Sequence, residues 1–309
     1  MNHAEDAPAK VLTKLSELEE LAKRSTIKKK LVLAVAQDDH SLEAVTAVAN
    51  KGIVEVFLVG SGSKIRAIVD KLKLNISGMT IVEEENDKQA VKLAVQMVHD
   101  HKGDILMKGN VPTAVLLRAV LDKEYGLRKS DVLSHFTLFE LPTYHKLIGL
   151  TDAAMIIAPD LKTKVAIINN AVDFMNRLGI SNPKVAILCA VEMVNESMPA
   201  TLDAAIIAKM GQRKQIKNCI IDGPLAYDNA ISKESAHHKG IVSDVAGDAD
   251  LLVVPDIEAG NILYKAYGFS CNATLAANVL GAAAPIVLTS RSDTEEAKQA
   301  SIIMAAAAQ

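Results

Sequence analysis

Short, nearly continuous apolar runs alternate with amphipathic stretches along most of the chain. The apolar runs predict strands at residues 31–36, 53–60, 104–107, 184–190, 219–221, 251–254 and 286–288. The stretches with helical spacing predict helices at 12–21, 41–52, 61–72, 90–98, 113–121, 163–178, 201–210, 261–269 and 293–308. Unbroken apolar strands that alternate with helices are typical of parallel sheets covered on both faces. The pattern therefore predicts an α/β fold.

Two parts of the chain differ in composition from these alternating strands and helices. Residues 136–139 and 147–151 are richer in β-branched and aromatic side chains, which favours a hairpin or edge strands and a domain boundary near 135–140. The Ala- and Leu-rich stretch 273–280 predicts another helix, ended by Gly281.

Composition narrows the class of protein. The chain has 309 residues, of which 50% are hydrophobic and 3% aromatic, with a formal net charge of −3 and no basic stripe. A nucleic-acid partner is therefore not expected. The polar N-terminus lacks an apolar signal core, and no run approaches the roughly 18 apolar residues of a membrane span. We expect a cytoplasmic protein without a membrane partner, whose three dispersed cysteines are mostly structural, with Cys271 the one to consider as a reactive thiol.

Polar clusters follow several predicted strands. Lys108, Gly109, Asn110 and Thr113 come after the strand at 104–107, and Ser290 and Arg291 come after the strand at 286–288. Ligands of open α/β sheets bind at the carboxyl ends of strands. An arginine beside a hydroxyl suits a phosphate or carboxylate, because its guanidinium donates two parallel charge-assisted hydrogen bonds. Ser292 and Glu295 form a possible capping box for the last helix.

Other kinds of site are less well supported. No Cys/His grouping has metal-ligand spacing, so no metal is expected. The turn at 60–63, GSGS, resembles the opening of a dinucleotide fingerprint, with acidic residues Glu83 to Glu85 about twenty positions on, but Ile65 stands where the third glycine belongs. An NAD-linked dehydrogenase is thus an alternative, although we find no carboxylate cluster for its divalent metal.

Four motifs that follow one another in a fixed order narrow the range of families that the sequence resembles. The segments KGNVPTAVLLRAVL, GPLAYDNAISKESA, VPDIEAGNILYKAYG and PIVLTSRSD together resemble the phosphate acetyltransferase and phosphate butyryltransferase family, over about residue 31 to the C-terminus. The IEAGN-x-LYK and LTSRSD motifs are more similar to those of the butyryltransferase branch. The resemblance implies a reversible reaction in which butanoyl-CoA and phosphate give butanoyl phosphate and CoA. A phosphate acetyltransferase is an alternative, and an acyl-CoA-sensing domain is a non-enzymatic one.

The resemblance also implies an architecture. It is a two-domain α/β/α sandwich related to the isocitrate and isopropylmalate dehydrogenases, with CoA in the cleft between the domains. Domain one would comprise residues 1–137 plus 286–309 and domain two 138–285, with homodimers formed mainly through domain two. CoA and acyl-CoA are substrates, and no bound cofactor is expected.

Residue roles follow by matching the motifs. Arg291 would bind the phosphate or acyl phosphate, and Ser290 would hydrogen-bond the CoA sulfur or the developing oxyanion. Arg118 would contact the CoA phosphates. Thr113 and the backbone of Gly109 and Asn110 match the place where the acyl phosphate is held, and Asn261 and Lys265 match the element that faces the cleft. Lys108 is a further candidate for binding the anionic substrates. The acetyl branch has an aspartate as proposed base where this chain has Ala297, so Asp293 is the favoured substitute and Glu296 the other candidate.

Overall fold

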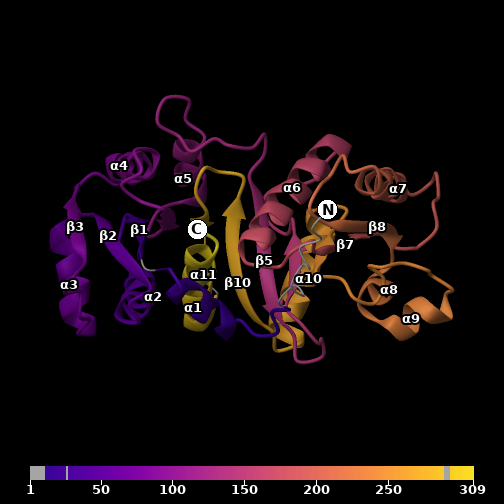
Figure 1. Cartoon of the computed structure of the whole chain (residues 1–309). Coiled ribbons are helices and arrows are strands. Elements are labelled where there is room, and N and C mark those ends of the chain that lie inside the picture. The colour runs from indigo at the N-terminus through magenta and orange to yellow at the C-terminus, as the bar shows by residue number, and fades with distance from the viewer. Residues whose placement is uncertain (1–10, 26, 289–292) are drawn as a thin grey trace, which may run out of the picture. The chain divides into compact units, whose positions relative to one another are not determined.

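The computed structural model describes residues 11–25, 27–288 and 293–309 (Figure 1). The chain divides into two compact units. The terminal unit comprises Ser16–Thr137 and Thr274–Gln309, and the central unit comprises Leu138–Ala273 together with the segment that ends at Leu15. The segment 274–285, predicted for the second domain, therefore belongs to the terminal unit. Among the described residues no helix is both long and apolar enough to cross a membrane.

The terminal unit has a mainly parallel sheet. Its strands, in spatial order, are β3 (Thr80–Glu83), β2 (Val54–Gly60), β1 (Lys29–Ala34), β4 (Ile105–Lys108), β11 (Ile286–Val287) and β10 (Thr274–Leu280). All neighbours in this series run parallel except β10, which is antiparallel to β11. β1 and β4 are buried through Leu31, Leu33, Leu106 and Met107. This confirms the α/β fold class for the unit.

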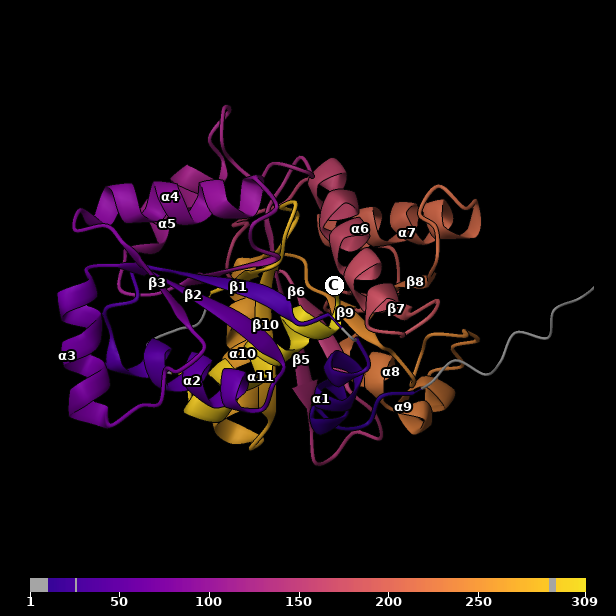
Figure 2. The same ribbon diagram turned by 60° about the vertical axis from the view of Figure 1, so that its left-hand side comes forward.

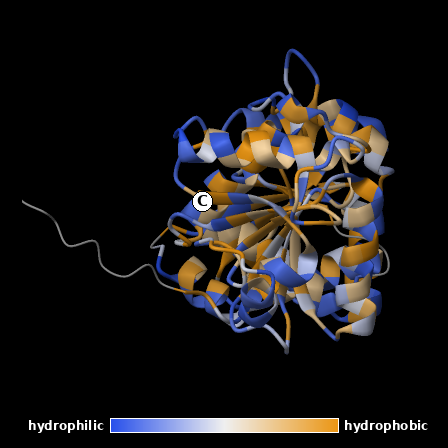
Figure 3. Ribbon diagram, turned by 90° about the vertical axis from the view of Figure 1, so that its right-hand side faces the viewer, coloured by the Kyte–Doolittle hydropathy of each residue, from blue (hydrophilic) through white to orange (hydrophobic). Residues whose placement is uncertain are grey.

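Helices cover both faces of that sheet. They are α1 (Ser16–Lys23), α2 (Asp39–Asn50), α3 (Gly62–Leu72), α4 (Asp87–His99), α5 (Thr113–Val120) and α11 (Glu295–Ala307). Figure 2 shows α4 and α5 on one side of β1 and β2, and α2 and α11 on the other. Hydrophobic and hydrophilic residues alternate along the helices in Figure 3, as expected when one face of each helix packs on a sheet.

The central unit likewise has helices packed around parallel strands. Its parallel strands, in spatial order, are β6 (Ile148–Thr151), β9 (Leu251–Val253), β7 (Lys184–Leu188) and β8 (Ile220–Leu225). Its helices are α6 (Leu161–Arg177), α7 (Pro199–Gln212), α8 (Tyr227–Ile231), α9 (Lys233–His238) and α10 (Ile257–Ser270). In Figure 1, α7 lies on one side of β8, and α8 and α9 lie on the other. Strand β5 (Ser134–Glu140) contains the boundary between the two units.

Two sequence predictions about elements are wrong. Residues 274–280 form strand β10 and not a helix, because a buried apolar run of this length fits either element and here pairs with β11. The predicted capping box fails because α11 begins at Glu295, and its N-cap is Thr294, whose side chain accepts a hydrogen bond from the Ala297 N–H.

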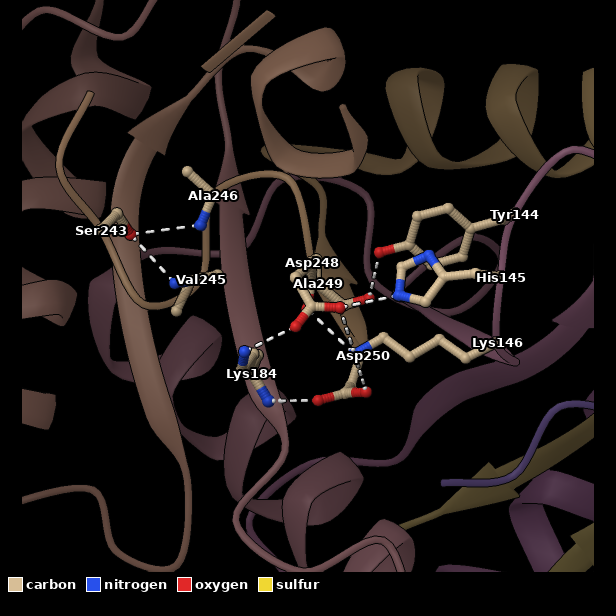
Figure 4. Close-up of polar contacts among 10 residues, drawn as sticks. All are labelled: Tyr144, His145, Lys146, Lys184, Ser243, Val245, Ala246, Asp248, Ala249 and Asp250. Atoms are coloured by element: carbon tan, nitrogen blue, oxygen red, sulfur yellow. Dashed lines mark hydrogen bonds and ion pairs between the residues drawn. The ribbon is translucent and has the colours of Figure 1, made fainter. Parts of the chain in front are cut away.

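An ion-pair network joins the amino ends of β6, β7 and β9 in the central unit (Figure 4). Asp248 accepts hydrogen bonds from Lys184 Nζ at 2.6 Å and His145 Nε2 at 2.8 Å, and Lys146 Nζ lies 3.0 Å from it. Lys146, almost fully buried, also pairs with Asp250 at 2.6 Å. Burial opposes ionisation of Asp248, but the hydrogen bonds from these three side chains outweigh it and hold its pKa well below its usual range.

We expect Asp248→Asn to lower the free energy of unfolding by about 2 kcal/mol at pH 7, because it removes the charge shared by three donors. A carboxyl whose pKa is lower in the folded state stabilises fully above its unfolded pKa of about 4, and this contribution declines as pH falls further. The difference between wild type and variant should therefore shrink below about pH 4. Urea unfolding at pH 7 and over a series down to pH 3 measures it. Asp100→Asn, which breaks an exposed pair with Lys102, should change stability by less than about 0.5 kcal/mol.

Candidate functional site

The segment from the end of β4 to the start of α5 carries four of the predicted site residues. Lys108 is half-buried, and its Nζ donates to the carbonyl oxygens of Gly109 at 3.2 Å and Val111 at 3.3 Å. Asn110 is exposed, and its side chain donates to the Gln37 carbonyl at 3.4 Å. The ammonium therefore lies at the carboxyl end of the strand, folded over the turn that leads to Thr113.

Gly109 is required by a close approach to the end of β1. A Cβ atom on it would lie 2.3 Å from the Val35 carbonyl oxygen and 2.7 Å from that of Ala34. Backbone bonds of 2.9 Å run from Gly109 N to Ala34 O and from Asn110 N to Val35 O. Val35 has φ of 56°, an unfavourable value for a β-branched residue. Strained backbone of this kind often marks functional sites, which favours this turn as part of one.

Helix α5 follows the turn and contains Thr113 and Arg118. It begins at Thr113, and its N-cap Pro112 makes no side-chain capping bond. The first-turn N–H groups of such a helix can bind an anion. Arg118 is exposed near the end of the same helix. The structure thus brings Lys108, Gly109, Asn110, Thr113 and Arg118 onto one continuous strand–turn–helix segment.

The turn after β11 is only partly described. Ser290 and Arg291 lie outside the described residues, so their predicted roles stay predictions. Asp293 is half-buried and directly precedes the N-cap of α11, and its carbonyl oxygen accepts a hydrogen bond from Lys298 Nζ at 3.0 Å. Lys298 did not figure among the predicted site residues. Its only sequence signal is that it stands, with Ser301 and Ile302, on the buried face of the helix.

The other two predicted residues belong to the central unit. Asn261 is exposed on α10, and its side chain donates to the Ala153 carbonyl at 3.3 Å. One residue earlier, a Cβ on Gly260 would lie 2.7 Å from the Asp152 carbonyl, so the AGN sequence lets the helix approach this backbone. Lys265 Nζ lies over the rings of Tyr264 and Phe269, at 5.3 and 5.7 Å from their centroids. That these residues share a site with Lys108 stays a prediction.

The GSGS turn does not favour a dinucleotide site. Ser61 Oγ donates to Glu85 Oε1 at 2.9 Å, and a Cβ on Gly62 would lie 2.3 Å from Glu83 Oε1. Carboxylates therefore crowd the start of α3, where a pyrophosphate would have to bind. Their negative charge would repel it.

Cysteines and metal ligands offer no further site in the described parts of the chain. Burial raises the pKa of the Cys189 and Cys219 thiols to about 11, so both are protonated at neutral pH, and Cys271 is exposed. No group of three or more His, Cys, Asp or Glu residues within residues 11–25, 27–288 and 293–309 could hold a metal ion.

Comparisons with known proteins identify relatives of similar sequence. The family model described as "Phosphate acetyl/butaryl transferase" matches residues 15–92 and 85–306. A phosphate butyryltransferase of Clostridium acetobutylicum is 46% identical over 278 residues, which cover 90% of this chain and 92% of that protein. A phosphate acetyltransferase of Thermotoga maritima is 43% identical over 278 residues, covering 90% of this chain and 94% of that protein.

A solved structure agrees with these sequence matches. The branched-chain phosphotransacylase from Enterococcus faecalis V583 superposes with a TM-score of 0.80 at 30% identity, covering 91% of this chain and 98% of that chain. The match extends over both compact units. The chain belongs to the phosphate acetyl/butyryl transferase family.

Proposed function

We propose that the chain is a phosphotransacylase that transfers a short acyl group reversibly between CoA and inorganic phosphate. The observation that carries the proposal is the 46% identity to a phosphate butyryltransferase over nearly the whole chain. The strand–turn–helix segment at 105–120 supports it, since a lysine and a helix N-terminus suit an anionic substrate.

The reaction needs two anionic substrates to be oriented together. A phosphate oxygen attacks the thioester carbonyl carbon, a tetrahedral oxyanion forms, and the C–S bond breaks to release the CoA thiolate, which takes up a proton. Such direct transfer draws its rate from proximity and from oxyanion stabilisation, and it calls for no bound cofactor.

Each residue has a proposed role in this scheme. Arg291 holds the phosphate, Ser290 donates to the oxyanion or the CoA sulfur, and Asp293 deprotonates the CoA thiol in the reverse direction. Lys108, Gly109, Asn110 and Thr113 hold the acyl phosphate, Arg118 contacts the CoA phosphates, and Asn261 and Lys265 contact CoA from the central unit.

The function is tested by phosphate-dependent release of thiol from acyl-CoA by the purified protein without added metal. We expect release to require phosphate, and kcat/KM to be about 30-fold higher for butanoyl-CoA or isobutanoyl-CoA than for acetyl-CoA, because each of the two extra carbons contributes about 1 kcal/mol of discrimination in an apolar pocket. A higher value for acetyl-CoA would favour a phosphate acetyltransferase. No thiol release from any short acyl-CoA would refute the proposed function.

We further propose that the protein is cytoplasmic and forms a homodimer through the central unit. Helix α10 exposes Ile262 and Phe269, which are 69% and 72% accessible, and a monomer would leave this apolar surface in water. Sedimentation velocity that yields a single monomeric species at micromolar concentration would contradict the dimer.

A further inference from the structure

The loop that follows strand β7 exposes two neighbouring apolar side chains in the central unit. Met193 and Val194, the apolar pair, are 71% and 58% accessible, and residues 191–197 line an open hollow of about 580 Å³. Covering the pair with a second apolar group would remove the surface of both from water. An apolar pair beside a hollow therefore favours a binding site.

The loop leaves the sheet at the edge where parallel sheets bind their ligands. β7 pairs in parallel with both β8 and β9, and Ile187 at its carboxyl end lies beside Val253 of β9. Helix α10, which carries the proposed CoA contacts Asn261 and Lys265, follows β9. The loop and the segment that leads to α10 thus begin at neighbouring strand ends of one unit, as the parts of one ligand site do in open α/β sheets.

Polar contacts hold the loop near both of its ends. The Glu192 carboxylate accepts hydrogen bonds from Lys239 Nζ at 3.0 Å and from the fully buried Asn229 side chain at 3.3 Å. Further along, the Thr201 hydroxyl accepts a hydrogen bond from the Asn195 N–H at 2.9 Å. Asn229 belongs to one of the four motifs by which the sequence resembles its family, and its contact indicates that this motif positions the loop.

The charge of the loop narrows the kind of group that the hollow suits. Residues 189–198 include Glu192 and Glu196 but no lysine or arginine. Lys239 balances the charge of Glu192, whereas Glu196 is exposed and would repel a phosphate. A neutral aliphatic group meets no such repulsion, and the flexible, polarizable side chain of Met193 can adapt to its shape.

We propose that Met193 and Val194 contact the aliphatic chain of the acyl group, and that Glu192 is a positioning residue that holds the loop. The inference rests on the proposed function, whose thioester substrate ends in such a chain. Contact with the apolar pair removes the chain from water, and the gain increases with the length of the chain. The loop then sets the preference for butanoyl-CoA over acetyl-CoA.

Met193→Gln tests this role, since it nearly keeps the length of the side chain and makes its end polar. We expect kcat/KM for butanoyl-CoA to fall about 10-fold, the discrimination that one methylene makes in an apolar pocket. The kcat/KM for acetyl-CoA and the KM for phosphate should stay within about twofold of wild type. Val242→Gln is the matched control, because it changes a fully exposed apolar residue of the same unit outside the hollow.

Glu192→Gln tests the positioning of the loop. It removes the charge that pairs with Lys239, so the KM for butanoyl-CoA should rise severalfold while kcat for acetyl-CoA and the KM for phosphate stay unchanged. A general loss of structure would instead lower kcat for both thioesters, and that result would remove the positioning role from Glu192.

Calorimetry with CoA and with butanoyl-CoA separates the acyl chain from the rest of the substrate. Met193→Gln should weaken the binding of butanoyl-CoA about 10-fold and leave that of CoA unchanged. Equal weakening of both ligands would assign the apolar pair to another part of CoA and overturn the inference. A variant that sediments as a smaller species with an unchanged chain-length preference would assign the pair to a subunit interface, which also overturns it.

The two proposals can fail separately. A wild type that binds butanoyl-CoA but releases no thiol would refute the phosphotransacylase function, yet the calorimetric comparison would still test the apolar pair. An active wild type whose Met193→Gln variant matches Val242→Gln in both assays would refute the inference alone. A wild type that binds neither CoA nor butanoyl-CoA would refute both.

Discussion

Arg291→Ala is expected to lower kcat/KM for phosphate-dependent release of CoA by about 100- to 1,000-fold, the usual cost of removing a donor that stabilises transition-state charge. In the proposed reaction the guanidinium holds the attacking phosphate through two parallel hydrogen bonds, and alanine replaces neither bond. The loss should appear in both the KM for phosphate and kcat, because the same group orients the phosphate and stabilises the developing charge.

Two variants sharpen the interpretation of that loss. Arg291→Lys keeps the charge but not the planar fork, so it should recover only part of the activity. Arg66→Ala removes an exposed arginine that faces Glu83 at 3.7 Å in the same unit, and it should leave kcat/KM within about twofold of wild type. An Arg291→Ala enzyme with wild-type kcat/KM would remove Arg291 from the phosphate site.

The sequence predicted those parts of the fold in which local pattern and burial agree. The apolar runs at 31–36, 53–60 and 104–107 became β1, β2 and β4, because strands covered on both faces need no polar alternation. Strand β10 was mistaken for a helix because its pairing with β11 is a long-range property that spacing alone does not carry. The short strand β3 was missed, since its four residues include no buried side chain.

Part of the candidate site could likewise be predicted from the sequence, and part of it could not. Motif matching placed Lys108, Gly109, Asn110, Thr113 and Arg118 on one segment, and chain continuity made their proximity predictable. The sequence could not reveal why residue 109 must be glycine, because the obstacle is the carbonyl of Val35, which directly follows strand β1. Nor could it reveal that Lys298 is buried, because that depends on what packs around α11.

Gly109→Ala should lower kcat/KM about 100-fold with little direct loss of substrate contacts. The added Cβ would lie 2.3 Å from Val35 O and 2.7 Å from Ala34 O, and both obstacles are backbone atoms that cannot rotate away. The turn must therefore move away from β1, which weakens the bonds from Gly109 N and Asn110 N and displaces Lys108 and Thr113. A displacement of about 1 Å can cost about 100-fold in rate when a site orients two reactants. Overpacking should also lower stability by about 1–3 kcal/mol.

Gly240→Ala separates the loss of activity from the loss of stability. Gly240 also belongs to a turn, with φ of +67°, but a Cβ there would meet no atom within 4 Å. Its alanine variant should lose about 1 kcal/mol of stability from the left-handed conformation and keep its kcat/KM. Thermal unfolding and thiol-release kinetics on both variants make the comparison. If Gly109→Ala loses stability yet keeps its kcat/KM, as Gly240→Ala should, the turn after β4 does not position the substrates, and Lys108 and Thr113 lose their proposed roles with it.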